Sequence, residues 1–115
     1  MSGQELLWTL NDTMRQAVEA NEEARRAAVE AAKARADYKA VKAVQVAALR
    51  GEKYPVSLIG DLVWADAALR EAYIRAETAD AEYQSLRETV LLRKREADIL
   101  RDQLSREWST AGMPV

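Results

Sequence analysis

Apolar residues recur at alternating spacings of three and four along most of this chain, the pattern of a helix with one buried stripe. In the second half the stripe is interrupted by a charge only at Arg93. A repeat with a period of about 3.5 residues predicts a left-handed coiled coil. The predicted seam positions in this half are Leu62, Leu69, Ala72, Ala76, Tyr83, Leu86, Val90, Ala97, Leu100 and Leu104.

The first half of the chain carries a matching register, in which most seam positions are alanine. Small seam residues let two helices approach closely and leave room for bulky residues on the facing helix. If the chain folds back on itself, Ala24 faces Leu86 and Tyr38 faces Ala72, so the bulky partner changes sides along the seam. The predicted seam positions here are Leu10, Ala17, Ala20, Ala24, Ala27, Ala31, Ala34, Tyr38 and Val41.

Breaker residues gather between the two halves, around Gly51 and Pro55. They predict a first helix over about 4–50, a corner at 51–57, a second helix over about 58–108 and a tail at 109–115. Gly51 is expected to close the first helix in a left-handed conformation, and Ser57 or Asp61 to cap the second. One alternative stays open near the start, where a cap within residues 11–13 would place Leu6, Leu7 and Trp8 on a short separate segment.

The distribution of charge supports an antiparallel arrangement of these two helices. Residues 33–53 hold 6 basic and 2 acidic side chains, whereas residues 61–82 hold 2 basic and 6 acidic ones. Folding back at the corner sets these two blocks side by side, and a parallel pairing would not. The sequence therefore predicts an all-α fold, a long antiparallel two-helix hairpin forming one domain over residues 1–115.

A lone hairpin with an alanine-rich seam buries little apolar area per residue, so a partner is expected. Apolar residues recur on a second side of the second helix, and we predict that they form a face for a second copy or for another protein. A symmetric dimer would make a four-helix bundle. A scatter of exposed apolar side chains, normal on any surface, is the other interpretation. The residues of the predicted face are Val63, Ile74, Leu92 and Ile99.

Tryptophans lie near both chain ends, which a hairpin brings together. Exposed aromatic residues at helix ends can anchor a partner. We expect instead that they help to close the open end of the hairpin as a small core, formed by Trp8, Leu10, Leu100, Leu104 and Trp108.

The amino-acid composition gives little support for a catalytic function. The chain has no cysteine and no histidine, which excludes disulfides, thiolate nucleophiles, Cys/His zinc sites and the Ser-His-Asp triad. Carboxylates at Glu19, Glu22, Glu23 and Glu30 lack the histidines that accompany them in helical metal sites, so we expect a solvated face. The sequence predicts no enzyme, no cofactor and no metal. It also shows no signal peptide or membrane span, which predicts a cytoplasmic protein.

A basic stripe in the first helix supplies candidate phosphate contacts at Lys33, Arg35, Lys39 and Lys42. Tyr38 lies within the stripe and could stack on bases, but it also occupies the seam. The acidic block opposite and the net charge of −2 leave nucleic-acid binding a secondary hypothesis.

A pattern in the second half adds a family resemblance. Ala76-Glu77 is followed by Tyr83, and then by Leu86-Arg87, Leu92-Arg93, Glu96, Leu100-Arg101 and Trp108. This order resembles that of small coiled-coil proteins of unknown mechanism encoded by bacteriophages and prophages. The resemblance implies a phage accessory protein in the host cytoplasm, acting beside replication or recombination proteins.

Four functional hypotheses follow. The first is a non-enzymatic protein-interaction module that binds a component of DNA metabolism. The second is a phage inhibitor of a host enzyme or defence complex, whose acidic faces around Glu19 and Asp61 mimic nucleic acid. The third is a direct nucleic-acid binder, and the fourth is a virion assembly protein.

Overall fold

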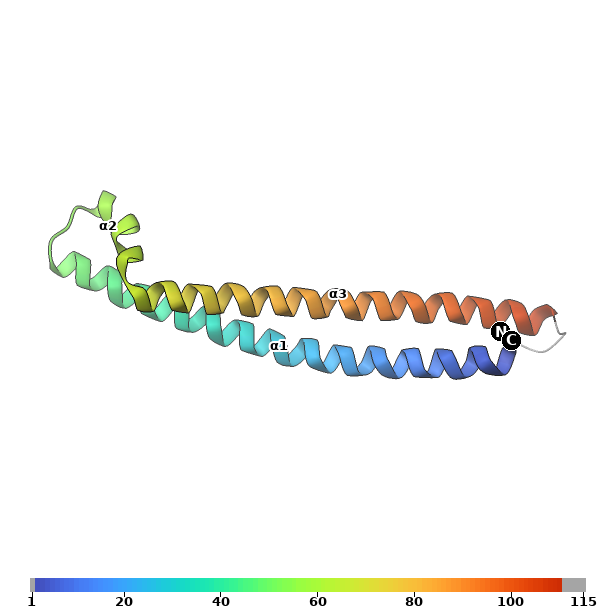
Figure 1. Cartoon of the computed structure of the whole chain (residues 1–115). Coiled ribbons are helices and arrows are strands. Elements are labelled where there is room, and N and C mark those ends of the chain that lie inside the picture. Colours follow the sequence, from blue (N-terminus) through green and yellow to red (C-terminus); the bar gives the residue numbers. More distant parts are fainter. Residues whose placement is uncertain (1, 111–115) are drawn as a thin grey trace. The chain divides into compact units, whose positions relative to one another are not determined.

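Every regular element of the described chain is helical. The computed structural model describes residues 2–110 (Figure 1). Helix α1 spans Gly3–Gly51, α2 spans Val56–Leu62, the short 3-10 helix η1 spans Val63–Ala65, and α3 spans Ala67–Thr110. No strand occurs within residues 2–110. The protein is therefore all-α over this range, as its alanine-rich and glycine-poor sequence predicts.

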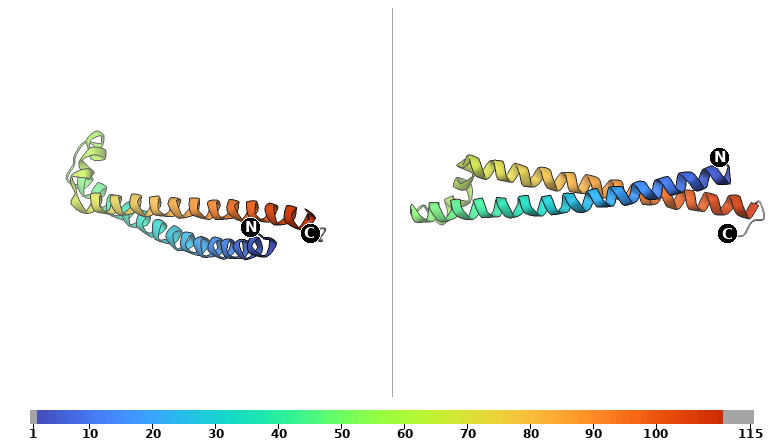
Figure 2. Two further views of the ribbon diagram at one scale, coloured as in Figure 1. Left: turned by 45° about the vertical axis from the view of Figure 1, so that its right-hand side comes forward. Right: turned by 90° about the horizontal axis from the view of Figure 1, so that it is seen from below.

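The described chain divides into two compact units, and α1 and α3 each contribute to both. We call residues 2–25 with 84–110 the terminal unit, and residues 26–83 the corner unit. Both long helices continue without a break from one unit into the other (Figure 2). The assignment of the chain to a single domain stays a prediction.

The start of α1 is fixed by a capping box. The Ser2 hydroxyl accepts a hydrogen bond from the Glu5 amide at 3.2 Å, and the Glu5 carboxylate accepts one from the Ser2 amide at 3.2 Å. This reciprocal pair satisfies amides that the first helical turn leaves unbonded. Because α1 is unbroken from Gly3 onward, the alternative of a separate first segment is wrong. The carboxylate of Asp12 accepts hydrogen bonds from Arg15 and Gln16 instead of capping a helix.

At the end of α1, the residue with the left-handed backbone conformation is not the predicted one. Lys53, and not Gly51, has a positive φ of 64°. The Lys53 amide donates to the Arg50 carbonyl at 3.0 Å, and the Tyr54 amide donates to the Leu49 carbonyl at 3.3 Å. These two bonds form a Schellman motif, which requires the left-handed residue two positions beyond Gly51. Gly51 itself remains the last helical residue of α1.

Helix α2 starts directly after Pro55, earlier than the sequence predicts. Pro55 has an extended conformation with a ψ of 139°, and its carbonyl accepts a hydrogen bond from the Leu58 amide at 2.9 Å. No side chain caps this helix. Ser57 and Asp61, the predicted caps, already lie inside α2 and so cannot reach its first amides.

A second break at Asp66 separates α3 from the corner, so the prediction of one unbroken helix from about 58 is wrong. Asp66 has an extended backbone with a ψ of 124°, and its carboxylate accepts a hydrogen bond from the Leu69 amide at 2.9 Å. This is N-cap geometry, which stabilises a helix start at Ala67. Helix α3 then continues to Thr110, so residues 109 and 110 of the predicted tail are helical. Residues 111–115 of that tail lie outside the described residues.

The corner unit has a small core where α2 and η1 meet the long helices. Ile59, Val63 and Leu69 are buried, with exposed fractions of 5%, 1% and 0%. Val63 was predicted on the outer face, but the tight turn of η1 directs its side chain inward. Partly buried residues complete the cluster: Tyr38, Val41, Val46, Leu49 and Trp64.

The terminal unit has a separate core between the first turns of α1 and the last turns of α3. Leu6, Leu10, Ala97 and Leu104 are buried there, with Leu7, Leu100 and Trp108 packed against them. A side chain at Gly3 would lie 3.3 Å from the Trp108 ring nitrogen, so glycine permits this close approach. Trp8 was expected in this core but is 62% exposed. Leu6 and Leu10 face inward. Trp8 lies two positions from each of them, so its side chain points to the opposite side of the helix.

The predicted seam residues are removed from solvent within their own units, with one exception. Leu62 is exposed because the heptad phase does not continue through the break at Asp66. Buried seam residues are Leu10, Ala24, Ala31, Leu69, Ala72, Ala76, Val90, Ala97 and Leu104. Half-buried seam residues are Ala17, Ala20, Ala27, Ala34, Tyr38, Val41, Tyr83, Leu86 and Leu100.

Candidate interaction surfaces

The described residues include no candidate metal site and no candidate membrane span. Within residues 2–110, no group of three or more carboxylate side chains lies close enough to hold a metal ion. In the same range, no helix is both long and apolar enough to cross a membrane. The surface features that remain are exposed apolar side chains and unpaired charges.

Three residues of the predicted partner face point to solvent from α3. Ile74, Leu92 and Ile99 have exposed fractions of 61%, 53% and 56%. Ile74 lies in the corner unit, and the other two lie in the terminal unit. The fourth predicted residue, Val63, belongs to the corner core. Other large apolar residues are also exposed on the long helices, namely Trp8, Met14, Val18, Val29, Val44, Tyr73 and Leu91.

The four side chains predicted to contact phosphate differ in whether another residue interacts with their charge. Lys33 pairs with Glu30 at 3.5 Å, and Arg35 pairs across the corner unit with Asp80 of α3 at 3.3 Å. The Lys42 ammonium lies 5.8 Å from the centre of the Tyr38 ring, a cation–π distance. Within the described chain, Lys39 has no ion-pair partner. The four cations therefore do not form one continuous surface of free charge.

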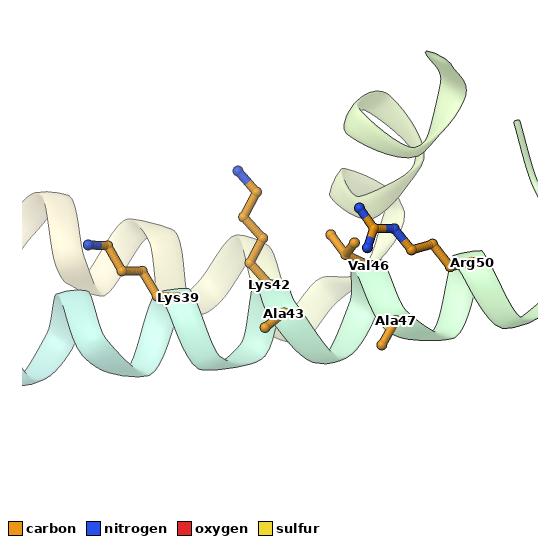
Figure 3. Close-up of a pocket in the computed structure, with 6 residues that line it drawn as sticks. All are labelled: Lys39, Lys42, Ala43, Val46, Ala47 and Arg50. Carbon is orange, nitrogen blue, oxygen red and sulfur yellow. The ribbon is translucent and has the colours of Figure 1, made fainter. Parts of the chain in front are cut away.

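A groove along the last turns of α1 was not predicted. Its volume is about 620 Å³, and Figure 3 shows its lining side chains on this helix: Lys39, Lys42, Ala43, Val46, Ala47 and Arg50. The methyl groups of its alanine and valine side chains form the apolar part of the groove. The charged groups of Lys39, Lys42 and Arg50 flank this part. Residues 38–51 include no acidic residue, and this absence is the sequence signal that could have identified the groove.

An aromatic cluster supports the same part of the corner unit. The Trp64 ring stacks on Tyr38 with centroids 6.3 Å apart and meets Tyr73 edge-on at 5.2 Å. The Trp64 carbonyl accepts a hydrogen bond from the Arg70 guanidinium at 2.6 Å. A second hollow of about 360 Å³ is lined by Trp64, Arg70, Tyr73 and Ile74. Sequence reasoning missed this cluster because Tyr73 lies outside the predicted seam.

Several acidic residues of the terminal unit pair with basic neighbours on the same helix. Arg15 bridges Asp12 and Glu19, and Arg25 pairs with Glu22 at 3.7 Å. The hydrogen bond from Arg15 to Asp12, and then the charges of Asp12 and Glu19, raise the pKa of the Arg15 guanidinium above its usual value. These spacings of three and four residues are those at which helical side chains meet.

No family model, curated protein or solved structure matches the chain.

Proposed function

We propose that this protein is a non-catalytic helical interaction module. In this proposal α1 and α3 of one chain form an antiparallel hairpin, and two hairpins associate into a four-helix bundle. The observation that carries the proposal is the exposure of Ile74, Leu92 and Ile99 on α3. Exposed aliphatic residues along one long helix, opposite its buried residues, are typical of helices that pack on a further helix.

Contacts inside each unit support the hairpin. In the corner unit, Arg35 of α1 pairs with Asp80 of α3, and further along α1 the Tyr38 ring contacts Tyr73 at 5.4 Å. Residue numbers thus rise along α1 as they fall along α3. In the terminal unit, Gly3 lies against Trp108 near the other ends of the two helices. An antiparallel hairpin accounts for the contacts within both units with a single connection.

Energetics support self-association of such a hairpin. The buried seam is mostly alanine, whose methyl group offers little apolar area to bury. Ordering each residue costs roughly 1 to 2 kcal/mol of conformational entropy. A long two-helix structure with small seam residues is therefore only marginally stable. Covering Ile74, Leu92 and Ile99 with a second copy adds apolar burial on the other side of α3, and a symmetric dimer is the commonest oligomer.

The alternatives that rely on charge have weaker support. A nucleic-acid mimic needs a continuous face of free carboxylates, but in the first acidic cluster Glu19, Glu22 and Glu30 each pair with a basic neighbour. A phosphate-binding stripe needs free cations, but Lys33 and Arg35 are paired. The family resemblance in the second half remains the basis for proposing a phage replication or recombination protein as a further partner of the module.

The mass of the protein in solution tests the self-association. We expect light scattering to give twice the 12.9 kDa of one chain at high concentration, with a fall toward one chain mass across a dilution series. The melting temperature should rise with concentration in parallel, because association stabilises the folded state by mass action. A mass of one chain at every concentration, with a constant melting temperature, would refute the bundle.

A further inference from the structure

The groove on α1 has a length and side-chain composition suited to packing against another helix. Lys39, Lys42, Ala43, Val46, Ala47 and Arg50 follow one another at steps of three, one, three, one and three, so they form one stripe along the helix. From Lys39 to Arg50 the stripe is about 17 Å long at 1.5 Å per residue. The small side chains of Ala43 and Ala47 permit a close approach, and the cations favour an acidic occupant.

A stripe of matching length and opposite charge lies on α3 of the same unit. Ile74 and Ala81 are exposed along this stripe, and Glu71, Glu77 and Glu82 lie on either side of them. The side of α3 that carries Ile74 is opposite the buried residues Leu69, Ala72 and Ala76. Within the described chain none of the three carboxylates has an ion-pair partner. Arg75 is the one cation within residues 71–82.

We propose that the groove of one copy binds the acidic stripe, residues 71–82, of a second copy. This inference rests on the proposed self-association and specifies its interface. An antiparallel approach sets Lys39 beside Glu82 and Arg50 beside Glu71 at the two ends. The same register brings Ile74 next to Ala47, where its exposed side chain enters the apolar part of the groove. Opposite charges then surround an aliphatic contact, which is the usual anatomy of a helix pair.

The chemistry of the groove favours a protein helix over nucleic acid. Its apolar part is aliphatic, whereas single-stranded nucleic acid is bound by stacking bases on exposed aromatic rings. The nearby rings of Tyr38 and Trp64 are stacked on each other, and the Lys42 ammonium lies 5.9 Å from the Trp64 ring centre. The carboxylates of the stripe, in the same unit, would also repel phosphate.

Reciprocal charge reversal tests this interface. The groove variant carries Lys39→Glu and Arg50→Glu, and the stripe variant carries Glu71→Lys and Glu82→Lys. All four side chains are exposed, so each variant should keep the helical circular dichroism of the parent. Alone, each variant sets like charges against each other, and we expect its dimer dissociation constant to rise about 100-fold or more. When the two variants are mixed in equal amounts, each groove again faces a stripe of opposite charge. Native mass spectrometry should then show a mixed dimer whose dissociation constant is close to that of the parent dimer.

A matched control reverses two charges outside the groove and the stripe. Arg87→Glu with Lys94→Glu, two exposed residues on a side of α3 away from Leu92 and Ile99, changes the net charge as the groove variant does, and it should leave the dissociation constant within about threefold. If both reversed variants dimerise like the parent, the interface is overturned while the proposed bundle stands. If the parent itself stays a single chain, the bundle and this interface are both overturned. If the parent is a single chain that binds a single-stranded oligonucleotide, and the groove variant loses that binding, the groove is a nucleic-acid site instead.

Discussion

Replacing Leu69 with alanine is expected to lower the free energy of unfolding by about 2 to 5 kcal/mol. Leu69 is fully buried, with an exposed fraction of 0%, and it packs with Ile59 and Val63 in the core of the corner unit. Truncation removes apolar burial and leaves a cavity that this small core cannot easily fill. The same residue's amide donates to the Asp66 carboxylate, so the core and the start of α3 are coupled.

Urea unfolding followed by circular dichroism measures this loss. The matched control is Leu91→Ala, the same truncation on the same helix at a residue that is 59% exposed. We expect the control to change the free energy of unfolding by less than about 0.5 kcal/mol. Equal losses in the two variants would contradict the position of Leu69 in a buried core.

Enlarging Ala24 to leucine should also destabilise the protein, by about 1 to 3 kcal/mol. Ala24 has an exposed fraction of 6%, in the terminal unit. The predicted register places it opposite Leu86, so three extra carbons are expected to overfill the seam there. Overpacking of this kind forces side chains out of their preferred rotamers or moves the backbone.

The control for Ala24 is Ala36→Leu on the exposed side of α1. Leucine is nearly as good a helix former as alanine, so this change should be close to neutral. Thermal unfolding of the two variants at one protein concentration gives the comparison. Similar melting temperatures for both variants would refute the assignment of Ala24 to the seam.

Helical periodicity could predict much of the fold because it depends on residues within one element. The positions of Ala24, Ala31, Ala72 and Ala97 on buried faces follow from steps of three and four residues. The approximate C-terminal end of α1 follows from the helix breakers Gly51 and Pro55, which are also local signals. These signals are local, so no knowledge of packing is needed to use them.

The corner could not be predicted in the same detail because its geometry depends on packing. The chain breaks at Asp66, where no glycine or proline marks a stop, and the break lets Val63 and Leu69 enter one core. Once Asp66 interrupts the helix, the heptad phase of Leu62 no longer holds. Lys53 adopts the left-handed conformation although Gly51 is nearby, because the Schellman bonds determine which residue must turn.

The candidate groove was predictable only in part. Lys39 and Lys42 were singled out by charge, but as contacts for phosphate. Arg50 and the methyl groups of Ala43 and Ala47 complete the groove, and alanines on a helix carry no sequence signal that separates a groove from a plain surface. The pairing of Arg35 with Asp80, which removes one of the predicted phosphate contacts, depends on a residue 45 positions away.

Intramolecular cross-linking tests the central claim, an antiparallel hairpin of α1 and α3, most directly. The chain has no cysteine, so Arg35→Cys with Asp80→Cys introduces the only two thiols. With a short bismaleimide we predict one linker joining the two cysteines of the same chain, seen by mass spectrometry at the mass of a single chain. Arg35→Cys with Glu71→Cys, displaced by about 13 Å along α3, should give little of this product. Links between chains alone, or equal linking of both pairs, would contradict the hairpin.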